Sequence, residues 1–388
     1  MNESNGIPLA AMDVAGRANR LRPLVHEAGC DALLVTNLTN VGYLTGFTGS
    51  AGLLLVLVDE MVLTTDGRYR QQASEQLAAA GVEARVEIGG LTRQREVMVS
   101  AAAGVGCLGL EAADITWAQQ RTFAGEWFPS AELVATTGVI EDLRQVKDAG
   151  ELARIAAAAS IADRALEVVK GRLAEDVTVV TEQEVALALD IEMRRLGASG
   201  SAFPTIVASG PNGAKPHALP SNRPIERGEM VVIDFGAMVD GYRSDMTRTL
   251  CVGPPATDTL ARMFEVVTEA QRAGVAVVAA GRPAADVDAA CRKVIDDAGW
   301  GPAFVHGTGH GVGLDIHEAP AVAKTSGDTL AAGHVVTVEP GVYIPRQGGV
   351  RVEDTVVVTN DGCQILTLSP KALSPKALSP EALSTRSR

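Results

Sequence analysis

The 388-residue sequence is poor in aromatic residues, which make up 4% of it, and it has no long apolar run. Its longest uninterrupted apolar segments, Leu53–Val58 and Val275–Ala280, have six residues each. A helix that crosses a membrane needs about 20 apolar residues, so the sequence predicts no membrane span. Residues 1–11 contain no basic residue and no apolar stretch, and we therefore expect no secretory signal.

Basic residues and cysteines are also scarce. The 34 Lys and Arg are outnumbered by 47 Asp and Glu, and a net charge of −13 argues against a nucleic-acid or anionic-membrane partner. The cysteines are odd in number and form no CxxC pair, which excludes a disulfide framework and a zinc finger. They are the five scattered residues Cys30, Cys107, Cys251, Cys291 and Cys363. We expect reduced thiols and a cytoplasmic protein.

Apolar side chains, by contrast, are plentiful: 46% of the residues are hydrophobic and 21% are charged, which excludes disorder as the main state. Short apolar runs alternate with polar, helix-compatible stretches over residues 1–145, and this predicts a small N-terminal α/β domain. The segment Asn40–Ser50 is rich in Gly and Thr, and we predict an ordered loop there. The predicted strands are Ala32–Thr36, Leu53–Val58, Met61–Thr65, Cys107–Leu110 and Glu132–Ala135, and the predicted helices include Tyr69–Ala80 and Leu91–Ala103.

A second domain is predicted over residues 146–368. Asp148 followed three residues later by Glu151 is typical of a capping box, and an apolar stripe of helical spacing runs from Leu152 to Val169. Further helices are predicted at about Glu182–Leu196, Asp258–Ala280 and Ala284–Ala298. Residues 148–252 and 258–360 therefore read as two halves, each with two helices followed by an antiparallel hairpin.

The C-terminal segment, residues 369–388, is of low complexity. The sequence Leu-Ser-Pro-Lys-Ala begins at Leu368 and again at Leu373, and Leu-Ser-Pro-Glu-Ala begins at Leu378. A proline in every five-residue copy interrupts regular hydrogen bonding, so we predict a disordered tail. Deletion of residues 371–388 is then expected to leave activity and melting temperature unchanged.

Two aspartates flank the dipeptide Asp240-Gly241, which favours a two-residue turn. A hairpin closed by that turn places Asp234 opposite Thr247, and Asp245 two positions back projects from the same face. Two carboxylates converging on a half-buried ribbon are unfavourable unless a cation or a shared proton compensates them. The alternative is that both aspartates are solvated on an exposed face.

A second acidic pair, Glu339 and Glu353, falls on two predicted strands that are joined through a glycine-rich bend. His306, His310 and His317 follow one another in a further glycine-rich segment. The glycines allow the backbone to approach a site closely, and such histidines are difficult to assign to a core.

Asp234, Asp245, Glu339, Glu353 and His310 together form an oxygen-rich, negatively charged set. Such a set suits hard or borderline divalent ions such as Mn²⁺. Four carboxylates are more than one ion usually needs, and they suit two ions roughly 3.5–4 Å apart that activate a water.

These segments carry a resemblance. The sequence IDFG…YRSDMTRT, the block HGTGHGVGLDIHE, and then VEPGVY and VRVEDT resemble the M24 metallopeptidases, in particular the branch of Xaa-Pro aminopeptidases and Xaa-Pro dipeptidases (prolidases). The resemblance implies a creatinase/prolidase-like N-terminal α/β domain followed by a pita-bread catalytic domain with a pseudo-two-fold repeat. It also implies two divalent metal ions per subunit, manganese first, with cobalt or zinc as alternatives.

Carried over by position, the resemblance makes Asp234, Asp245, His310, Glu339 and Glu353 the metal ligands, with Asp245 and Glu353 bridging. The resemblance further implies that a hydroxide held by the metals would attack the scissile carbonyl and that Glu339 would accept and relay the proton. His217, His306 and His317 match the histidines that surround the metals or contact substrate. Arg351 either contacts the substrate carboxylate or holds a neighbouring carboxylate, and a purely structural ion pair is the alternative. Phe203 is one candidate for the wall of a proline pocket.

The predicted activity is metal-dependent removal of the N-terminal residue before proline from a peptide, by a homodimer or homotetramer. Preference for dipeptides or for longer peptides stays open at this point. A creatinase-like or lyase enzyme of the same fold is the first alternative, and the complete ligand set counts against it. A non-catalytic binding protein is the second, and the ligand set and the net charge of −13 count against that.

Overall fold

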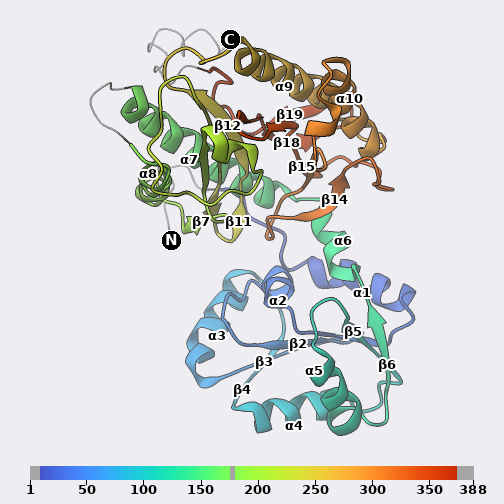
Figure 1. Cartoon of the computed structure of the whole chain (residues 1–388). Helices are drawn as coiled ribbons and strands as arrows, with labels where there is room; N and C mark the ends of the chain where they lie inside the picture. Colours follow the sequence, from blue (N-terminus) through green and yellow to red (C-terminus); the bar gives the residue numbers. More distant parts are fainter. Residues whose placement is uncertain (1–8, 175–179, 374–388) are drawn as a thin grey trace. The chain divides into compact units, whose positions relative to one another are not determined.

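The computed structural model describes residues 9–174 and 180–373 (Figure 1). The chain divides into two compact units. Ala11–Arg144 form the N-terminal unit, and the described residues from Gln145 onward, with residues 9–10, form the C-terminal unit.

The N-terminal unit is built on a six-stranded mixed sheet in the order β4-β3-β2-β1-β5-β6. Strand β1 pairs in parallel with β5 and antiparallel with β2, and alternation of strands with helices gives the predicted α/β character. The strands are β1 (Ala32–Val35), β2 (Leu53–Val56), β3 (Met61–Thr65), β4 (Arg85–Ile88), β5 (Cys107–Glu111) and β6 (Glu132–Thr136). The helices are α1 (Arg17–Glu27), α2 (Leu38–Thr45), α3 (Arg70–Ala79), α4 (Leu91–Ala101), α5 (Trp117–Thr122) and α6 (Val139–Gln145), with a short 3₁₀ turn, η1 (Gly67–Tyr69), and a π turn, η2 (Phe123–Trp127).

Helix α2 corrects the prediction of a loop over Asn40–Ser50. The side chain of Asn37 accepts hydrogen bonds from the backbone N–H groups of Thr39 and Asn40 and so caps the first turn. Gly46 ends the helix with a φ of +76°, a conformation that glycine adopts at little cost. The residues that follow form the loop, so the prediction was wrong for the first part of the segment.

The C-terminal unit has two similar halves. In the first, α7 and α8 pack on the sheet β12-β9-β8, and in the second, α9 and α10 pack on the sheet β14-β13-β15-β18-β19 (Figure 1). The helices are α7 (Ala149–Ala174), α8 (Glu182–Arg195), α9 (Asp258–Val277) and α10 (Ala284–Asp297), with 3₁₀ turns η3 (Gly210–Ala214) and η4 (Gly301–Ala303). The strands are β7 (Gly200–Ser201), β8 (Ile206–Ser209), β9 (Met230–Phe235), β10 (Ala237–Val239), β11 (Tyr242–Arg243), β12 (Met246–Cys251), β13 (Gly309–Gly311), β14 (Glu318–Val322), β15 (Val335–Val338), β16 (Gly341–Ile344), β17 (Gly348–Arg351), β18 (Asp354–Val358) and β19 (Cys363–Ile365).

Local signals in the sequence account for the start of α7 and for the first hairpin. Asp148 and Glu151 exchange hydrogen bonds between side chain and backbone, each 2.8 Å long, as the predicted capping box requires. The backbone turns at Asp240 and Gly241, whose φ angles are 49° and 85°. The register that follows places Thr247 opposite Asp234, which confirms the predicted pairing.

The structure differs from the predicted tail at its first residues. The backbone N–H of Ser369 donates to Asp163, and the ammonium group of Lys371 lies against Asp354 and Gln271. Main-chain and side-chain groups of this first repeat therefore make defined polar contacts with the rest of the unit. Residues 374–388, for which disorder was also predicted, lie outside the described residues.

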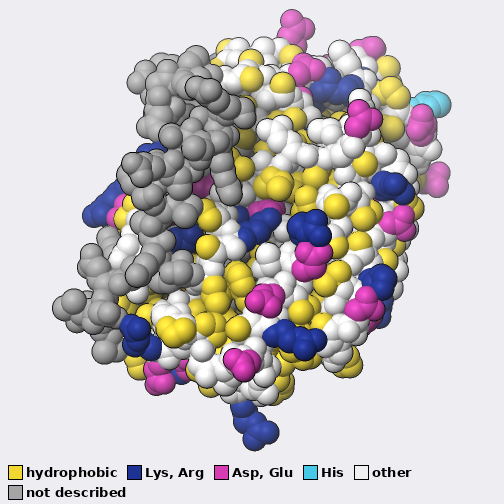
Figure 2. Space-filling view, turned by 90° about the horizontal axis from the view of Figure 1, so that it is seen from above, with side chains coloured by type: hydrophobic (Ala, Val, Ile, Leu, Met, Phe, Trp, Pro, Cys, Tyr) yellow, Lys and Arg dark blue, Asp and Glu magenta, His cyan; other side chains and the backbone are white. Residues whose placement is uncertain are grey.

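Two observations bear on membranes and on charged partners. Among the described helices, none is long and apolar enough to cross a bilayer. On the face drawn in Figure 2, basic and acidic side chains of the described residues are interspersed among apolar ones, without a continuous basic patch.

Candidate metal centre

Four acidic side chains stand at or near strand ends in the two halves of the C-terminal unit. Asp234 belongs to β9, and Asp245 directly precedes β12. Glu339 directly follows β15 and Glu353 directly precedes β18. Because Val338 pairs with Asp354 in the β15–β18 ladder, Glu339 and Glu353 are the next opposed positions along that ribbon.

His310 lies among these carboxylates. Its Nε2 atom is 3.6 Å from Asp245 Oδ2 and 3.4 Å from Glu339 Oε1. Ligand atoms of Asp245, His310 and Glu353 all lie within 4.8 Å of one another. The structure therefore brings together all five residues that the sequence analysis singled out as ligands, and they line one pocket of about 270 Å³.

Glycine permits this placement of His310. A Cβ atom on Gly309 would collide with the main-chain oxygen of Thr337, and one on Gly311 would collide with the main-chain oxygen of Ala319. The strand that bears His310 is therefore packed more closely against its neighbours than a side chain would allow.

Burial and mutual repulsion dominate the electrostatics of the carboxylates. Burial raises the pKa of Asp245 well above its usual range, and the negative charges of Glu353 and Asp234 raise it further. The pKa of Glu353 is raised for the same reasons, burial first and then neighbouring acids. Burial would also raise the pKa of Glu339, but its hydrogen bond to His310 and the positive charges nearby outweigh burial and lower the pKa to about 2.

These residues fit divalent cations. Within the described parts of the chain, Asp234 Oδ1 and Glu353 Oε1 are buried oxygens that have no hydrogen-bond partner. Buried oxygens without donors, in a cluster of four acids, need positive charge to offset the cost of burial. Carboxylate oxygens and one imidazole are also the donor set that borderline divalent metals bind.

Arg351 supplies part of the positive charge. Its guanidinium forms an ion pair of 2.5 Å with Asp234 Oδ2, and its Nε lies 3.9 Å from Glu339 Oε2. It also donates to Tyr343 Oη at 2.9 Å and to the main-chain oxygen of Pro216 at 3.1 Å. Of the roles left open by the sequence, holding a neighbouring carboxylate is the one for which the structure gives a contact, although Arg351 also lines the pocket.

The three further histidines lie beside the carboxylates. His217, His306 and His317 line a pocket of about 180 Å³ that also includes His310 and Glu339. His306 Nε2 is 2.8 Å from Tyr343 Oη, and the rings of His310 and His317 meet edge to face at 4.4 Å. Burial lowers the pKa of His306, which favours the neutral ring.

Two residues that hold this arrangement together were not among those predicted from the sequence. Thr247 donates from its hydroxyl to Glu353 Oε2 at 2.6 Å and accepts from Arg351 Nε at 3.0 Å. Its position opposite Asp234 was a signal that could have pointed to it. Tyr343 links His306 to Arg351, and its place at the end of the VEPGVY segment was the signal that could have pointed to it.

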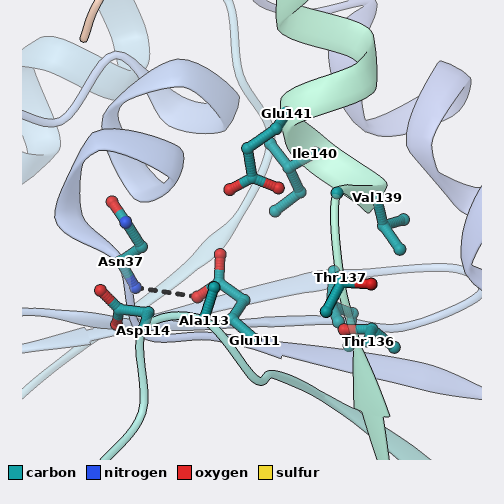
Figure 3. A pocket seen from close by; sticks show the side chains of 11 residues that line it. Asn37, Glu111, Ala113, Asp114, Thr136, Thr137, Val139, Ile140 and Glu141 are labelled. Atoms are coloured by element: carbon teal, nitrogen blue, oxygen red, sulfur yellow. Dashed lines mark hydrogen bonds between the residues drawn. The ribbon is translucent and has the colours of Figure 1, made fainter. Parts of the chain in front are cut away.

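A further pocket, of about 170 Å³, lies in the N-terminal unit (Figure 3). Glu111 at its floor accepts hydrogen bonds from the backbone N–H groups of Thr36 and Asn37, at 2.6 and 2.8 Å. The side-chain amide of Asn40 donates to its other oxygen at 2.7 Å. Both oxygens of Glu111 thus accept hydrogen bonds from the segment that leads into α2 and from its first turn.

Comparison with known proteins agrees with this geometry. Residues 153–360 match Metallopeptidase family M24, and residues 17–146 match the Creatinase/Prolidase N-terminal domain. The Xaa-Pro dipeptidase of Pyrococcus furiosus is 35% identical over 360 residues, which are 92% of this chain and 99% of that protein.

Solved structures are similar over nearly the whole chain. The Xaa-Pro dipeptidase from Bacillus anthracis superposes with a TM-score of 0.87 at 40% identity, covering 93% of this chain and 99% of that one. The X-Pro aminopeptidase from Thermotoga maritima gives a TM-score of 0.81 at 33% identity, covering 90% and 99%. These likenesses confirm the predicted fold class, an α/β N-terminal domain followed by a pita-bread domain. The chain belongs to Metallopeptidase family M24 and is a peptide hydrolase.

Proposed function

We propose that this chain removes the N-terminal residue that precedes proline in a peptide, using two divalent metal ions, in the first instance Mn²⁺. The observation that carries the proposal is the convergence of four carboxylates and His310 in one pocket, with two buried oxygens that have no partner among the described residues. The names of the relatives, Xaa-Pro dipeptidase and X-Pro aminopeptidase, support the choice of substrate.

In this proposal five residues would hold the cations: Asp234, Asp245, His310, Glu339 and Glu353. The chemistry that two divalent cations supply when bound is a lowered pKa for a water molecule and polarisation of the scissile carbonyl. Asp245 and Glu353 are the candidates for contact with both cations. Arg351 keeps Asp234 in place through its ion pair, and Thr247 does the same for one oxygen of Glu353.

Proton transfer and charge stabilisation are assigned to residues of the pocket. Glu339 is the candidate to accept a proton and pass it to the leaving nitrogen, since it lines both the pocket of the carboxylates and the pocket of the histidines. His217, His306 and His317 are the candidate donors to the negative charge that develops on the carbonyl oxygen, because they line one pocket with His310 and Glu339.

Recognition of proline is assigned to the apolar part of the pocket. The nitrogen before which cleavage occurs carries no N–H, so the ring must be recognised by shape. Phe203, Ile206 and Ile316 line the same pocket as the carboxylates and offer an apolar wall. Truncation of Phe203 to Ala is expected to raise KM for Ala-Pro more than it lowers kcat.

The decisive assay is hydrolysis of a proline-peptide series by chelator-stripped protein before and after addition of Mn²⁺. Ala-Pro and Ala-Pro-Ala are the first substrates, and their relative kcat/KM distinguishes a dipeptidase from an aminopeptidase. Asp245→Ala and His310→Ala are expected to lose both the metal and the activity. Full turnover by either variant would contradict the mechanism.

The assembly and the compartment are part of the same proposal. The resemblance to prolidases favours a homodimer or homotetramer, and reduced cysteines favour the cytoplasm. All five cysteines are free thiols in the structure. Sedimentation of the Mn²⁺-loaded protein should give a dimer or tetramer, and a fully active monomer would exclude that assembly.

A further inference from the structure

The first copy of the C-terminal repeat is held in the C-terminal unit at both of its ends. At its start, the backbone N–H groups of Leu368 and Ser369 each donate to the carboxylate of Asp163 at 2.7 Å. Directly after its end, the main-chain oxygen of Leu373, the first residue of the second copy, accepts from the backbone N–H of Cys251 at 2.8 Å. A low-complexity segment is thus fixed in a single register by polar contacts.

Lys371, in the middle of this copy, meets a buried acid. Its ammonium group pairs with Asp354 and donates to Gln271 Oε1 at 2.8 Å. The Asp354 side chain is fully buried, whereas that of Lys371 is 26% exposed. A buried carboxylate requires compensating charge, and Lys371 provides one of two cations.

Arg248 is the other cation, and it connects Asp354 to the metal centre. Arg248 donates to Asp354 Oδ1 at 2.8 Å and also to the main-chain oxygen of Glu353. A further bond of 2.9 Å reaches the main-chain oxygen of Thr247, whose hydroxyl holds the Glu353 carboxylate. Arg248 therefore links the charge compensation of Asp354 to the backbone position of Glu353.

We propose that Lys371 is a positioning residue for the metal centre, and that any copy of the repeat that carries lysine can occupy its place. The proposal rests on the function proposed above in so far as Glu353 is a metal ligand. While Lys371 pairs with Asp354, Arg248 can donate both to Asp354 and to the main-chain oxygens of Thr247 and Glu353. Without this lysine, Asp354 draws Arg248 away from the main-chain oxygens of Thr247 and Glu353. The backbone at Glu353 then loses a hydrogen bond that holds it.

The sequence of the repeat provides an internal test. Residues 368–373 and residues 373–378 have the same six residues, Leu-Ser-Pro-Lys-Ala-Leu, whereas residues 378–383 have Glu381 in place of the lysine. Removal of residues 368–372 therefore leaves the docked sequence unchanged. Removal of residues 368–377 places Glu381 against the buried Asp354, where like charges repel.

Four variants follow from this: removal of residues 374–388, removal of residues 368–372, removal of residues 368–377, and the last combined with E381K. The melting temperature of the metal-free protein and the Kd for Mn²⁺ by calorimetry are the two readouts. The first two variants should match the unaltered chain. The third should melt about 5 °C lower and bind Mn²⁺ about 10-fold more weakly, and E381K should restore both values.

The third and fourth variants have the same length, so their difference isolates one side chain. A third variant that matches the unaltered chain in both readouts would overturn the proposal, as would failure of E381K to restore them. A lower melting temperature with unchanged Mn²⁺ affinity would make Lys371 merely structural and would also overturn it. Hydrolysis of Ala-Pro is recorded separately: if the unaltered chain binds Mn²⁺ but cleaves no proline peptide, the proposed function fails while the positioning role stands on the two readouts.

Discussion

The hydroxyl of Thr247 donates a hydrogen bond of 2.6 Å to Glu353 Oε2 and so connects the two halves of the C-terminal unit at the centre of the site. The other oxygen, Glu353 Oε1, is buried and has no partner in the part of the chain that the structure describes. One oxygen of this carboxylate is therefore fixed by the protein and the other is available to a ligand. This division is what a metal-binding carboxylate requires of its surroundings.

Replacement of Thr247 by Val removes the hydroxyl and keeps the shape of the side chain. We expect the affinity for Mn²⁺ to fall about 10-fold to 100-fold, because Glu353 loses the contact that orients it. Calorimetric titration of chelator-stripped protein measures this. Thr268→Val is the matched control, since the Thr268 hydroxyl has no hydrogen-bond partner among the described residues. An unchanged Kd in Thr247→Val would contradict the orienting role.

Arg351→Met should destabilise the metal-free protein by about 3–5 kcal/mol. The substitution leaves Asp234 as a buried charge that has lost its cation, and removal of one partner from such a pair is costly. Urea unfolding at pH 7 gives the free energy directly. Arg272→Met, which breaks a pair exposed on α9, serves as the control and should not change the urea midpoint. Equal midpoints for the two variants would show that Arg351 does not compensate the acidic cluster.

His310→Ala and His317→Ala should separate metal binding from catalysis. His310 lies within 3.6 Å of two carboxylates of the set, so its loss should abolish both Mn²⁺ binding and hydrolysis. His317 contacts the His310 ring, and its loss should lower kcat about 10²-fold to 10³-fold while metal content stays unchanged. The exposed His26, on α1, provides a control variant. Loss of metal from the His317 variant would place that residue among the ligands instead.

Lys170 on α7 permits a pH-dependent prediction that does not involve the metal centre. Burial lowers the pKa of its ammonium group below that of the unfolded chain. The native state therefore binds this proton less tightly, and the penalty is complete at pH values below the native pKa and fades as pH rises towards the unfolded value. Lys170→Met should raise the urea midpoint at pH 7, with a smaller gain at pH 10. Lys293→Met, at an exposed position, is the control and should not raise the urea midpoint at pH 7. An equal rise in the midpoint of Lys170→Met at both pH values would contradict burial as the cause.

The sequence could predict features that depend on neighbouring residues. Asp240 and Gly241 both tolerate a positive φ, which specifies a two-residue turn and thereby the pairing of Asp234 with Thr247. Asp148 and Glu151 are three residues apart, so the start of α7 is equally local. The predicted ligands follow from such registers together with the family resemblance.

Features that depend on distant residues could not be predicted. Helix α2 contains one glycine and three threonine or asparagine positions. The backbone N–H groups of Thr36 and Asn37, just before the helix, donate to Glu111, more than 70 residues away. The docking of Lys371 depends on Asp354 and Gln271, and the link between Arg248 and Asp354 spans 106 residues. Pairing of charges across such separations leaves no periodic pattern in the sequence, so a repeat rich in proline was interpreted as disordered along its whole length.

The most direct measurement of the central claim is an anomalous difference map, recorded above the manganese absorption edge, from crystals of the Mn²⁺-loaded protein. The account predicts two peaks in each subunit, surrounded by Asp234, Asp245, His310, Glu339 and Glu353. A map without a peak among these five side chains, from protein that cleaves Ala-Pro at its full rate, would contradict it.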